Sequence, residues 1–412
     1  MDPHRSPPTE ARRGESRSSN GPIRLAGAPL DLCAYPAETI TNRHFRSLEL
    51  PPMERIYLPP PLTSLLEGEP EETLHFIEDD NRGAILPEAV ATLDGTPFYL
   101  SVKGVGSNVD PYSWRTLDRT YASELSDDAR VGRRLQQGRE TGSDRIITGE
   151  LWLRGSPYGG QGLEHGMTAL KISERADLTS IGGFLIAPVV KLSLLPLGLE
   201  EQLRHIHWYR KYPGRMVQEL RLVPSNVRVY FHAKSTVGNN IRQVFDQFRI
   251  DTNGAALQFE TNFLRTTVAL LTLFARTLTF DVARGTYEGL DFHDVWLDKD
   301  AVVAPDGSVY FVDLEGIEPV SVEKGGVPEK IEDQIYRSLY ELTFAYEQIE
   351  QERARRFGSV GSRKRHFEAV LGDAVKDDPF VRLRTVGGNA ELVIQNNCQE
   401  ESLYTRFRAV DR

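Results

Sequence analysis

The chain has 412 residues, 40% of them hydrophobic and 26% charged, an ordinary globular composition that suits a core of about two or three subdomains. The formal net charge of −10 disfavours a nucleic-acid binder, because such proteins carry a surplus of lysine and arginine. Cys33 and Cys398 are too few for a disulfide framework, so we expect a reducing, cytoplasmic compartment. We expect no membrane span, because no run of about 18 apolar residues occurs.

The N-terminal part changes from polar to strand-like sequence. Residues 1–24 are polar and rich in proline, serine and arginine, which predicts a disordered tail. Residues 25–80 are proline-rich and predict irregular chain with short helical pieces. The segments GAILPEAVATL (83–93) and PFYLSVKG (97–104) flank an Asp-Gly turn, and this pattern predicts a β-hairpin. The charged residues 115–147 predict an exposed insertion.

The following segments change from strand signals to helical spacing. We expect a helix over 161–173 and a buried strand within 184–196. Residues 216–234 predict a strand pair or a strand that leads into a hinge. Apolar residues at helical spacing then predict helices over 256–278 and 328–357.

This order predicts an α+β fold with the two lobes of a protein kinase. The β-rich N-lobe would span residues 25–215 and include the charged insertion. A hinge and a mostly helical C-lobe would span residues 216–412, with the loop that carries chemistry in this second lobe.

The segment HDVWLDKDAVVAPDGSVYFVDLEG (293–316) resembles a kinase catalytic loop followed by a metal-binding strand end. Kinases carry H-R-D-x-x-x-x-N and then D-F-G in this order. Val295 stands at the position of the catalytic aspartate, Asp300 at that of the metal-binding asparagine, and Asp313 at that of the D-F-G aspartate. Two carboxylates at the mouth of a hairpin suit Mg²⁺ or Mn²⁺, whereas solvated carboxylates of a charged turn are the alternative.

A lysine ends the second strand of the predicted hairpin. Lys103 precedes Gly104 and Gly106, and a lysine at such a strand end contacts nucleotide phosphates when a helix glutamate holds it. Glu164 is the candidate glutamate, with Gln161 as the competing residue one turn earlier. A solvated lysine is the alternative.

The third candidate element is RLVPSNVR, in which Arg221 and Arg228 flank a Pro-Ser turn. Guanidinium groups bind phosphate well, because their forked donors match phosphate oxygens. Two surface arginines of a strand pair are the alternative interpretation.

Together these segments resemble the selenoprotein O (SelO) family of kinase-like protein adenylyltransferases. FYLSVKGVGSNVDPYS is similar to the family's lysine strand with K-G-x-G and a downstream P-Y-S. RLVPSNVR resembles its R-V-A-P-S-x-x-R segment, and HDVWLDKDAVV…VYFVDLEG resembles its H-G-V-M-N-T-D-N…I-D-Y-G loop. The matching segments lie in order over residues 83–318.

The resemblance implies that ATP binds in a reversed orientation and that AMP is transferred to protein Ser, Thr or Tyr hydroxyls. It implies that Lys103, Arg221 and Arg228 hold the outer phosphates, with Gly104 and Gly106 beside the nucleotide. It also implies that Asp300 and Asp313 hold Mg²⁺ or Mn²⁺.

The loop departs from the family pattern at the base position. The family carries adjacent Asp-Asn, and the aligned residues here are Lys299 and Asp300. Asp298 or Asp294 would therefore have to accept the proton of the acceptor hydroxyl. Glu315 and the nearby Glu318 belong either to a second metal site or to a solvated acidic loop.

Three functions remain open from the sequence. The first is an ATP-dependent protein adenylyltransferase with a protein acceptor. The second is an ordinary kinase that transfers the γ-phosphate and makes little use of the arginine pair. The third is a nucleotide-binding pseudokinase that serves as a scaffold, which Lys299 at the base position favours.

Overall fold

The computed structural model shows an α+β fold in which a large sheet precedes most of the helical chain. It describes residues 29–36, 38–45, 55–58, 73–79, 83–93, 95–103, 161–175, 186–195, 197, 214–229, 241–292, 300–359, 361–386, 389–395 and 402–406.

The strands of the N-terminal half form one antiparallel sheet. They are β1 (Pro29–Pro36), β2 (Thr39–Thr41), β3 (Arg55–Leu58), β4 (Thr73–Asp79), β5 (Gly83–Leu93), β6 (Thr96–Lys103), β7 (Gln161–Gly162), β8 (Val189–Leu194) and β9 (Met216–Val223). Among the described residues this sheet has nine strands in the order β2-β8-β9-β6-β5-β4-β1-β3, with β7 paired to β9. The strands β1, β3 and β4 lie where irregular chain with short helical pieces was expected, so that expectation was wrong.

The predicted hairpin is confirmed as β5 and β6, which pair antiparallel on either side of the Asp-Gly turn. Gly95 has φ of +79°, a left-handed conformation that glycine adopts at little cost. Phe98, Leu100 and Val102 are buried in an apolar cluster, which fixes the strand that ends at Lys103.

The predicted helix before β8 is also confirmed, as α5 (Leu163–Ser173). It packs closely on the sheet, because a Cβ at Gly166 would meet the side chains of Val217 and Leu192. The backbone N–H of Val189 donates to the hydroxyl of Ser173 at 2.8 Å, which joins the end of α5 to the start of β8.

A second predicted hairpin connects the sheet with the helices. It consists of β12 (Ala301–Val303) and β13 (Val309–Phe311). The chain leaving β9 pairs with β12, because Val303 N donates to Val227 O at 2.8 Å and Val229 N donates to Ala301 O at 3.1 Å. The turn of the hairpin needs Gly307, whose φ is +92° and whose Cβ would collide with the backbone of Phe259.

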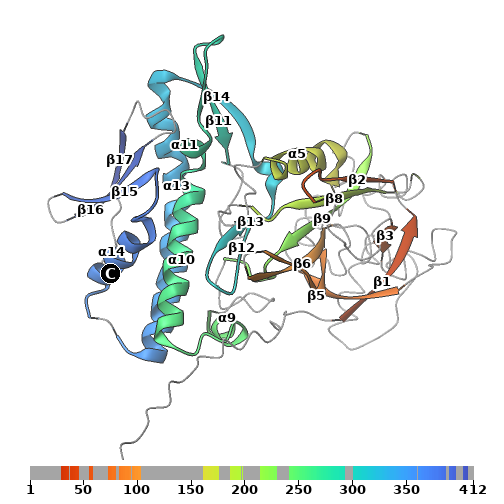
Figure 1. The fold of residues 1–412 in the computed structure, drawn as a ribbon, viewed down its shortest axis with the longest axis horizontal. Helices are drawn as coiled ribbons and strands as arrows, with labels where there is room; N and C mark the ends of the chain where they lie inside the picture. The colour runs from red at the N-terminus through yellow and green to blue at the C-terminus, as the bar shows by residue number, and fades with distance from the viewer. Residues whose placement is uncertain are drawn as a thin grey trace, which may run out of the picture.

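The helical half follows. Its helices are α9 (Ile241–Gln247), α10 (Asn253–Leu271), α11 (Leu273–Thr277), α13 (Val327–Phe357) and α14 (Arg363–Val375), with the 3-10 turns η1 (Leu314–Gly316) and η2 (Lys324–Gly326). The predicted helices over 256–278 and 328–357 are confirmed as α10 with α11 and as α13. Figure 1 shows the large sheet on one side of the molecule and α10, α13 and α14 on the other.

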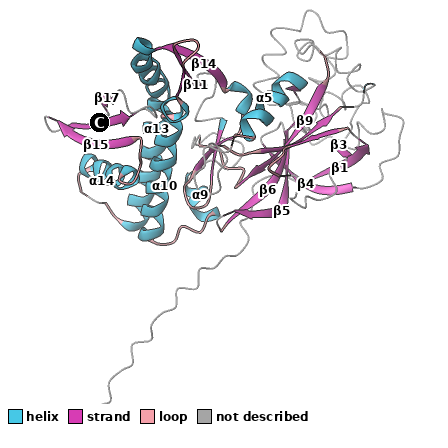
Figure 2. Cartoon of the chain, turned by 45° about the horizontal axis from the view of Figure 1, so that its top comes forward, coloured by secondary structure: helices cyan, strands magenta, loops and turns pink. Residues whose placement is uncertain are grey.

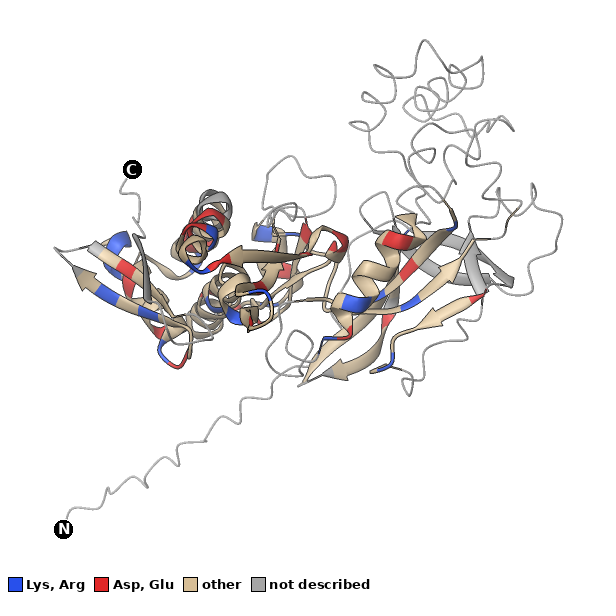
Figure 3. Ribbon diagram, turned by 90° about the horizontal axis from the view of Figure 1, so that it is seen from above, with Lys and Arg blue, Asp and Glu red and all other residues tan. Residues whose placement is uncertain are grey.

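Buried charges join three of these helices. Arg353 of α13 forms a buried ion pair with Glu260 of α10, and His366 Nε2 of α14 lies 2.8 Å from Glu260 Oε2. Figure 3 shows that residues of both charge signs are interspersed over the sheet and the helices. Contacts between helices are therefore partly ionic, in addition to the apolar packing of Phe263 and Val268.

The second half also contains small sheets that were not expected. One is formed by β10 (Thr279–Asp281), β11 (Thr286–Asp291) and β14 (Glu318–Glu323), and another by β15 (Val381–Val386), β16 (Asn389–Gln395) and β17 (Ser402–Arg406). Figure 2 shows the latter beside α13 and α14. The prediction of a mostly helical second half therefore missed these strands, because short strands become recognisable only once they pair.

The predicted boundary between the two parts also changes. Strand β9 pairs with both β6 and β8, so the β-rich part extends to Val223 instead of ending at residue 215. The predicted tail (1–24) and the predicted insertion (115–147) lie outside the described residues.

Candidate functional site

Three predicted site residues meet where the large sheet borders the β12–β13 hairpin. Lys103 is the last residue of β6, and Arg221 lies in the adjacent strand β9. Asp313 follows β13 and immediately precedes η1. The fold therefore brings together side chains that are 92 to 210 positions apart in the sequence.

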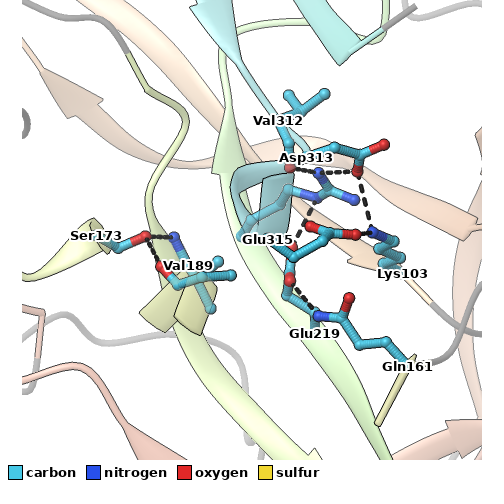
Figure 4. A network of polar contacts seen from close by, with 10 residues as sticks. Lys103, Gln161, Ser173, Val189, Glu219, Val312, Asp313 and Glu315 are labelled. Atoms are coloured by element: carbon cyan, nitrogen blue, oxygen red, sulfur yellow. Dashed lines mark hydrogen bonds and ion pairs between the residues drawn. The ribbon is translucent and has the colours of Figure 1, made fainter. Parts of the chain in front are cut away.

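The ammonium group of Lys103 binds two carboxylates from the hairpin side. Its Nζ donates to Asp313 Oδ1 at 3.0 Å and forms a second ion pair with Glu315. Arg221 Nη1 lies 3.5 Å from the same oxygen of Asp313 and donates to the carbonyl of Val312. Figure 4 shows this network, with dashed lines from Lys103 to both Asp313 and Glu315.

A buried glutamate lies in the sheet beneath these contacts. Glu219 is directly opposite Lys103 in the β6–β9 pairing, and its side chain has 0% exposure. Its Oε1 lies 3.4 Å from Arg221 Nε, and its Oε2 accepts a hydrogen bond from Gln161 Nε2 at 2.7 Å. Glu219 thus contacts Arg221 and Gln161 and lies opposite Lys103 in the strand pairing.

The charges perturb one another strongly. Burial lowers the pKa of Lys103, but the nearby carboxylates, chiefly Asp313 and Glu315, outweigh burial and raise this pKa above its ordinary value. Burial raises the pKa of Asp313, but Lys103 and the two arginines outweigh burial and hold this pKa well below its usual range. Burial raises the pKa of Glu219, although Arg221 and Lys103 act in the opposite direction.

Arg228 and Asp300 belong to the same site. Arg228 forms an antiparallel bridge with Val302 of β12, and its charge contributes to lowering the pKa of Asp313. Asp300 is buried, and its side chain contributes to lowering the pKa of Asp313. The backbone N–H of Val312 also donates to the carbonyl of Asp300 at 2.8 Å, which keeps the two carboxylates adjacent.

The predicted glutamate partner of Lys103 lies elsewhere. Glu164 is exposed in the first turn of α5, and the structure pairs Lys103 with Asp313 and Glu315 instead. The interpretation of Glu315 as part of a solvated loop also needs correction, because this side chain is only 22% exposed and binds Lys103. Glu318 is exposed.

Several predicted residues are not described by the structure. They are Gly104, Gly106, His293, Asp294, Asp298 and Lys299. The position of the expected base relative to the network therefore stays a prediction.

The chemistry of two carboxylates fits the expected divalent cation. Asp300 and Asp313 are kept adjacent by the backbone hydrogen bond from Val312 to Asp300, and carboxylate oxygens are the ligands that Mg²⁺ and Mn²⁺ prefer. Among the described residues, no group of three or more His, Cys, Asp or Glu side chains is arranged to hold a metal ion. A cation here would thus need further oxygen ligands, such as phosphate groups.

Sequence reasoning missed Glu219. The signal was present, because Glu219 and Arg221 are charged residues inside a strand, MVQELRLV, that is buried at every position. A charge at the centre of a buried strand is almost always paired. Gln161, which was considered as a direct partner of Lys103, lies at the site through its hydrogen bond to Glu219.

Comparison of the chain with protein-family models, curated proteins and solved structures gave no match. Within the part of the chain that the structure describes, no helix combines the length and apolarity that crossing a bilayer requires.

Proposed function

We propose that the protein is an ATP-dependent protein adenylyltransferase with a kinase-like arrangement of two lobes. One observation carries the proposal: Lys103 Nζ and Arg221 Nη1 lie 3.0 and 3.5 Å from the same oxygen of Asp313, and the charge of Arg228 also helps to lower the pKa of this carboxyl. A protein kinase uses one lysine for the nucleotide phosphates. Three cations around a carboxylate at the D-F-G position suit a triphosphate whose outer phosphates are held firmly, as the resemblance to the selenoprotein O family implies.

The two-lobed interpretation is supported by how the site is divided between the two parts of the chain. The β-rich part contributes Lys103 and Arg221 from adjacent strands, and the hairpin of the second part contributes Asp300 and Asp313. Kinases divide the lysine and the metal-binding aspartate in the same way.

The proposed reaction conserves atoms and charge. The oxygen of a protein hydroxyl forms a bond to the α-phosphorus of ATP, and the bond from this phosphorus to the oxygen that bridges to the β-phosphorus breaks. Pyrophosphate leaves, and the hydroxyl proton passes to a carboxylate base, for which Asp298 is the candidate.

The residues of this chain contribute positioning and charge neutralisation. Lys103, Arg221 and Arg228 would bind the β- and γ-phosphates and stabilise the negative charge that develops on pyrophosphate. Asp300 and Asp313 would hold Mg²⁺ or Mn²⁺, which neutralises phosphate charge when bound. Transfer of this kind depends mainly on positioning and electrostatics.

A second candidate function is nucleotide binding without transfer. Lys299 at the expected base position favours it, because a protonated lysine cannot accept the proton of an acceptor hydroxyl. In this role the protein would serve as a scaffold, and ATP would stabilise its fold by mass action.

The test uses ATP labelled at either the α- or the γ-phosphate, with lysate proteins and Mg²⁺ or Mn²⁺. The wild type is compared with Asp313→Ala, and Asp373→Ala on the exposed surface of α14 is the matched control. We expect label from the α-phosphate only, and only with the wild type and the control.

The other outcomes separate the alternatives. Transfer of γ-label alone would identify a kinase and remove the assigned role of the arginines. Absence of both labels, together with a rise in melting temperature on adding ATP, would favour the scaffold.

A further inference from the structure

We propose that Glu219 is the positioning residue that orients Lys103 and Arg221 for the outer phosphates of the nucleotide. In kinases a glutamate of a helix holds the lysine. Here the carboxylate comes from the neighbouring strand β9 instead. The inference rests on the proposed function, because it assumes that these two cations bind phosphate.

The geometry of the sheet places Glu219 next to both cations. Lys103 and Glu219 are direct partners in the antiparallel pairing of β6 and β9. Glu219 and Arg221 are two residues apart in one strand, so their side chains lie on the same face, with Oε1 and Nε 3.4 Å apart. One buried carboxylate thus forms an ion pair with Arg221 and lies opposite Lys103 in the strand pairing, whereas Glu164 of α5 is exposed.

The other carboxylates around Lys103 are less suited to this role. The side chains of Asp313 and Glu315 are 23% and 22% exposed, respectively, so they lie on the side that an incoming phosphate can reach. A phosphate that binds Lys103 would compete with them for the ammonium group. Glu219 has no exposed side-chain surface and can remain paired while the nucleotide binds.

Gln161 gives this arrangement a link to helix α5. Its side-chain amide donates to Glu219 Oε2 at 2.7 Å, and it lies in β7 directly before the helix. Two pairings of β7 with β9, Gln161 with Val217 and Gly162 with Met216, fix its backbone. In this chain the strand that leads into the helix therefore carries the residue that holds the glutamate.

Burial of Glu219 supports a role in the site. Burial raises its pKa, which means that the protein environment disfavours the charged form of this carboxylate. A buried ion pair is weak support for fold stability, since the cost of desolvation offsets much of the attraction. Perturbed titratable groups in a cluster of this kind are frequent at functional sites.

The experiment compares binding of ATP and of adenosine to the wild type and Glu219→Gln. We expect ATP to bind at least roughly tenfold more weakly to the variant, because Lys103 and Arg221 lose their common anchor. Adenosine binding should change by less than about twofold, since adenosine carries no phosphate. A merely structural role would weaken both ligands equally. Glu329→Gln, at an exposed position of α13, is the matched control.

Two further variants keep the test decisive if Glu219→Gln does not fold. Glu219→Asp retains the charge but shortens the side chain, so we expect it to bind ATP more weakly than the wild type. Where Glu219→Gln folds, Glu219→Asp should bind ATP more tightly than Glu219→Gln. Gln161→Leu frees one oxygen of Glu219 and should weaken ATP binding in the same direction by a smaller factor.

Several outcomes would overturn the inference. Unchanged or tighter ATP binding by Glu219→Gln would mean that this carboxylate is dispensable or only repels phosphate. If Glu164→Gln loses ATP binding and Glu219→Gln binds ATP as the wild type does, the residue that orients Lys103 is Glu164 of helix α5. If the wild type itself binds no ATP, the proposed function fails and this inference fails with it.

Discussion

Replacement of Glu315 by glutamine should strengthen ATP binding. In the structure Glu315 neutralises Lys103 from the side that retains some exposure to solvent. A phosphate oxygen and the Glu315 carboxylate would therefore compete for the same ammonium group. Glutamine keeps the size of the side chain and removes its charge, and Lys103 still keeps its bond to Asp313.

The expected gain in ATP affinity follows from the burial of the ion pair between Lys103 and Glu315. Two unit charges in contact attract each other by about 4 kcal/mol at an effective dielectric constant of about 20. Desolvation and side-chain ordering reduce the net value to about 1 kcal/mol for exposed pairs, whereas removing one partner of a fully buried pair costs about 3–5 kcal/mol because the other charge is left unpaired. The side chains of Lys103 and Glu315 are 11% and 22% exposed, so we expect about 1.4 kcal/mol, or roughly tenfold in the dissociation constant.

Isothermal titration calorimetry with ATP and Mg²⁺ measures this effect. Glu318→Gln is the matched control, because Glu318 lies three residues further along the chain and is exposed. The control should bind ATP as the wild type does. Without ATP, Glu315→Gln should be less stable than the wild type by about 1 kcal/mol.

Weaker ATP binding by Glu315→Gln would refute this reasoning. It would indicate that Glu315 contacts the nucleotide through a cation, as a member of a second metal site. An unchanged affinity for ATP would also contradict it, because it would mean that Glu315 does not compete with phosphate for Lys103.

Three further predictions concern the framework of the site. Gly307→Ala should destabilise the protein by more than about 2 kcal/mol, because the cost of a left-handed φ adds to that of a collision with the backbone of Phe259. Gly95→Ala, with open space around the new Cβ, should cost only about 1 kcal/mol. A denaturant titration measures both changes in unfolding free energy. Arg353→Met should cost about 3–5 kcal/mol, since it removes the buried cation that pairs with Glu260, and Lys376→Met, which breaks an exposed pair with Asp373, less than about 1 kcal/mol. The lowered pKa of Asp313 adds stability that is present above about pH 4 and is lost as the pH falls through the folded-state pKa. The difference in unfolding free energy between the wild type and Asp313→Asn should therefore shrink as the pH falls below about 4, and a constant difference would contradict the assignment.

Local signals in the sequence determined much of the secondary structure. The Asp-Gly turn marked the hairpin that ends at Lys103, and the Pro-Asp-Gly turn marked the hairpin before Asp313. The amphipathic pattern of α13 marked a helix with Pro328 in its first turn and Gly358 after its end. These features could be predicted because turn chemistry and apolar period depend only on residues close in the sequence.

Strands without such signals were missed. Residues 29–36, 55–58 and 73–79 join the large sheet, and residues 381–386, 389–395 and 402–406 form a small sheet in the second half. Their strand character depends on partners that lie elsewhere in the chain, and β-propensity is sensitive to that context. Tertiary pairing, and not local preference, decided these elements.

The sequence by itself identified Lys103, Arg221 and Asp313 as candidates, through residue type and the resemblance of the segments around them. Only the tertiary structure decided which groups they contact. The register of β6 and β9 puts Glu219 opposite Lys103, and a slip of one residue would turn that carboxylate to the other face of the sheet. Contacts of this kind depend on pairing between distant strands, so the pattern of a single segment does not contain them.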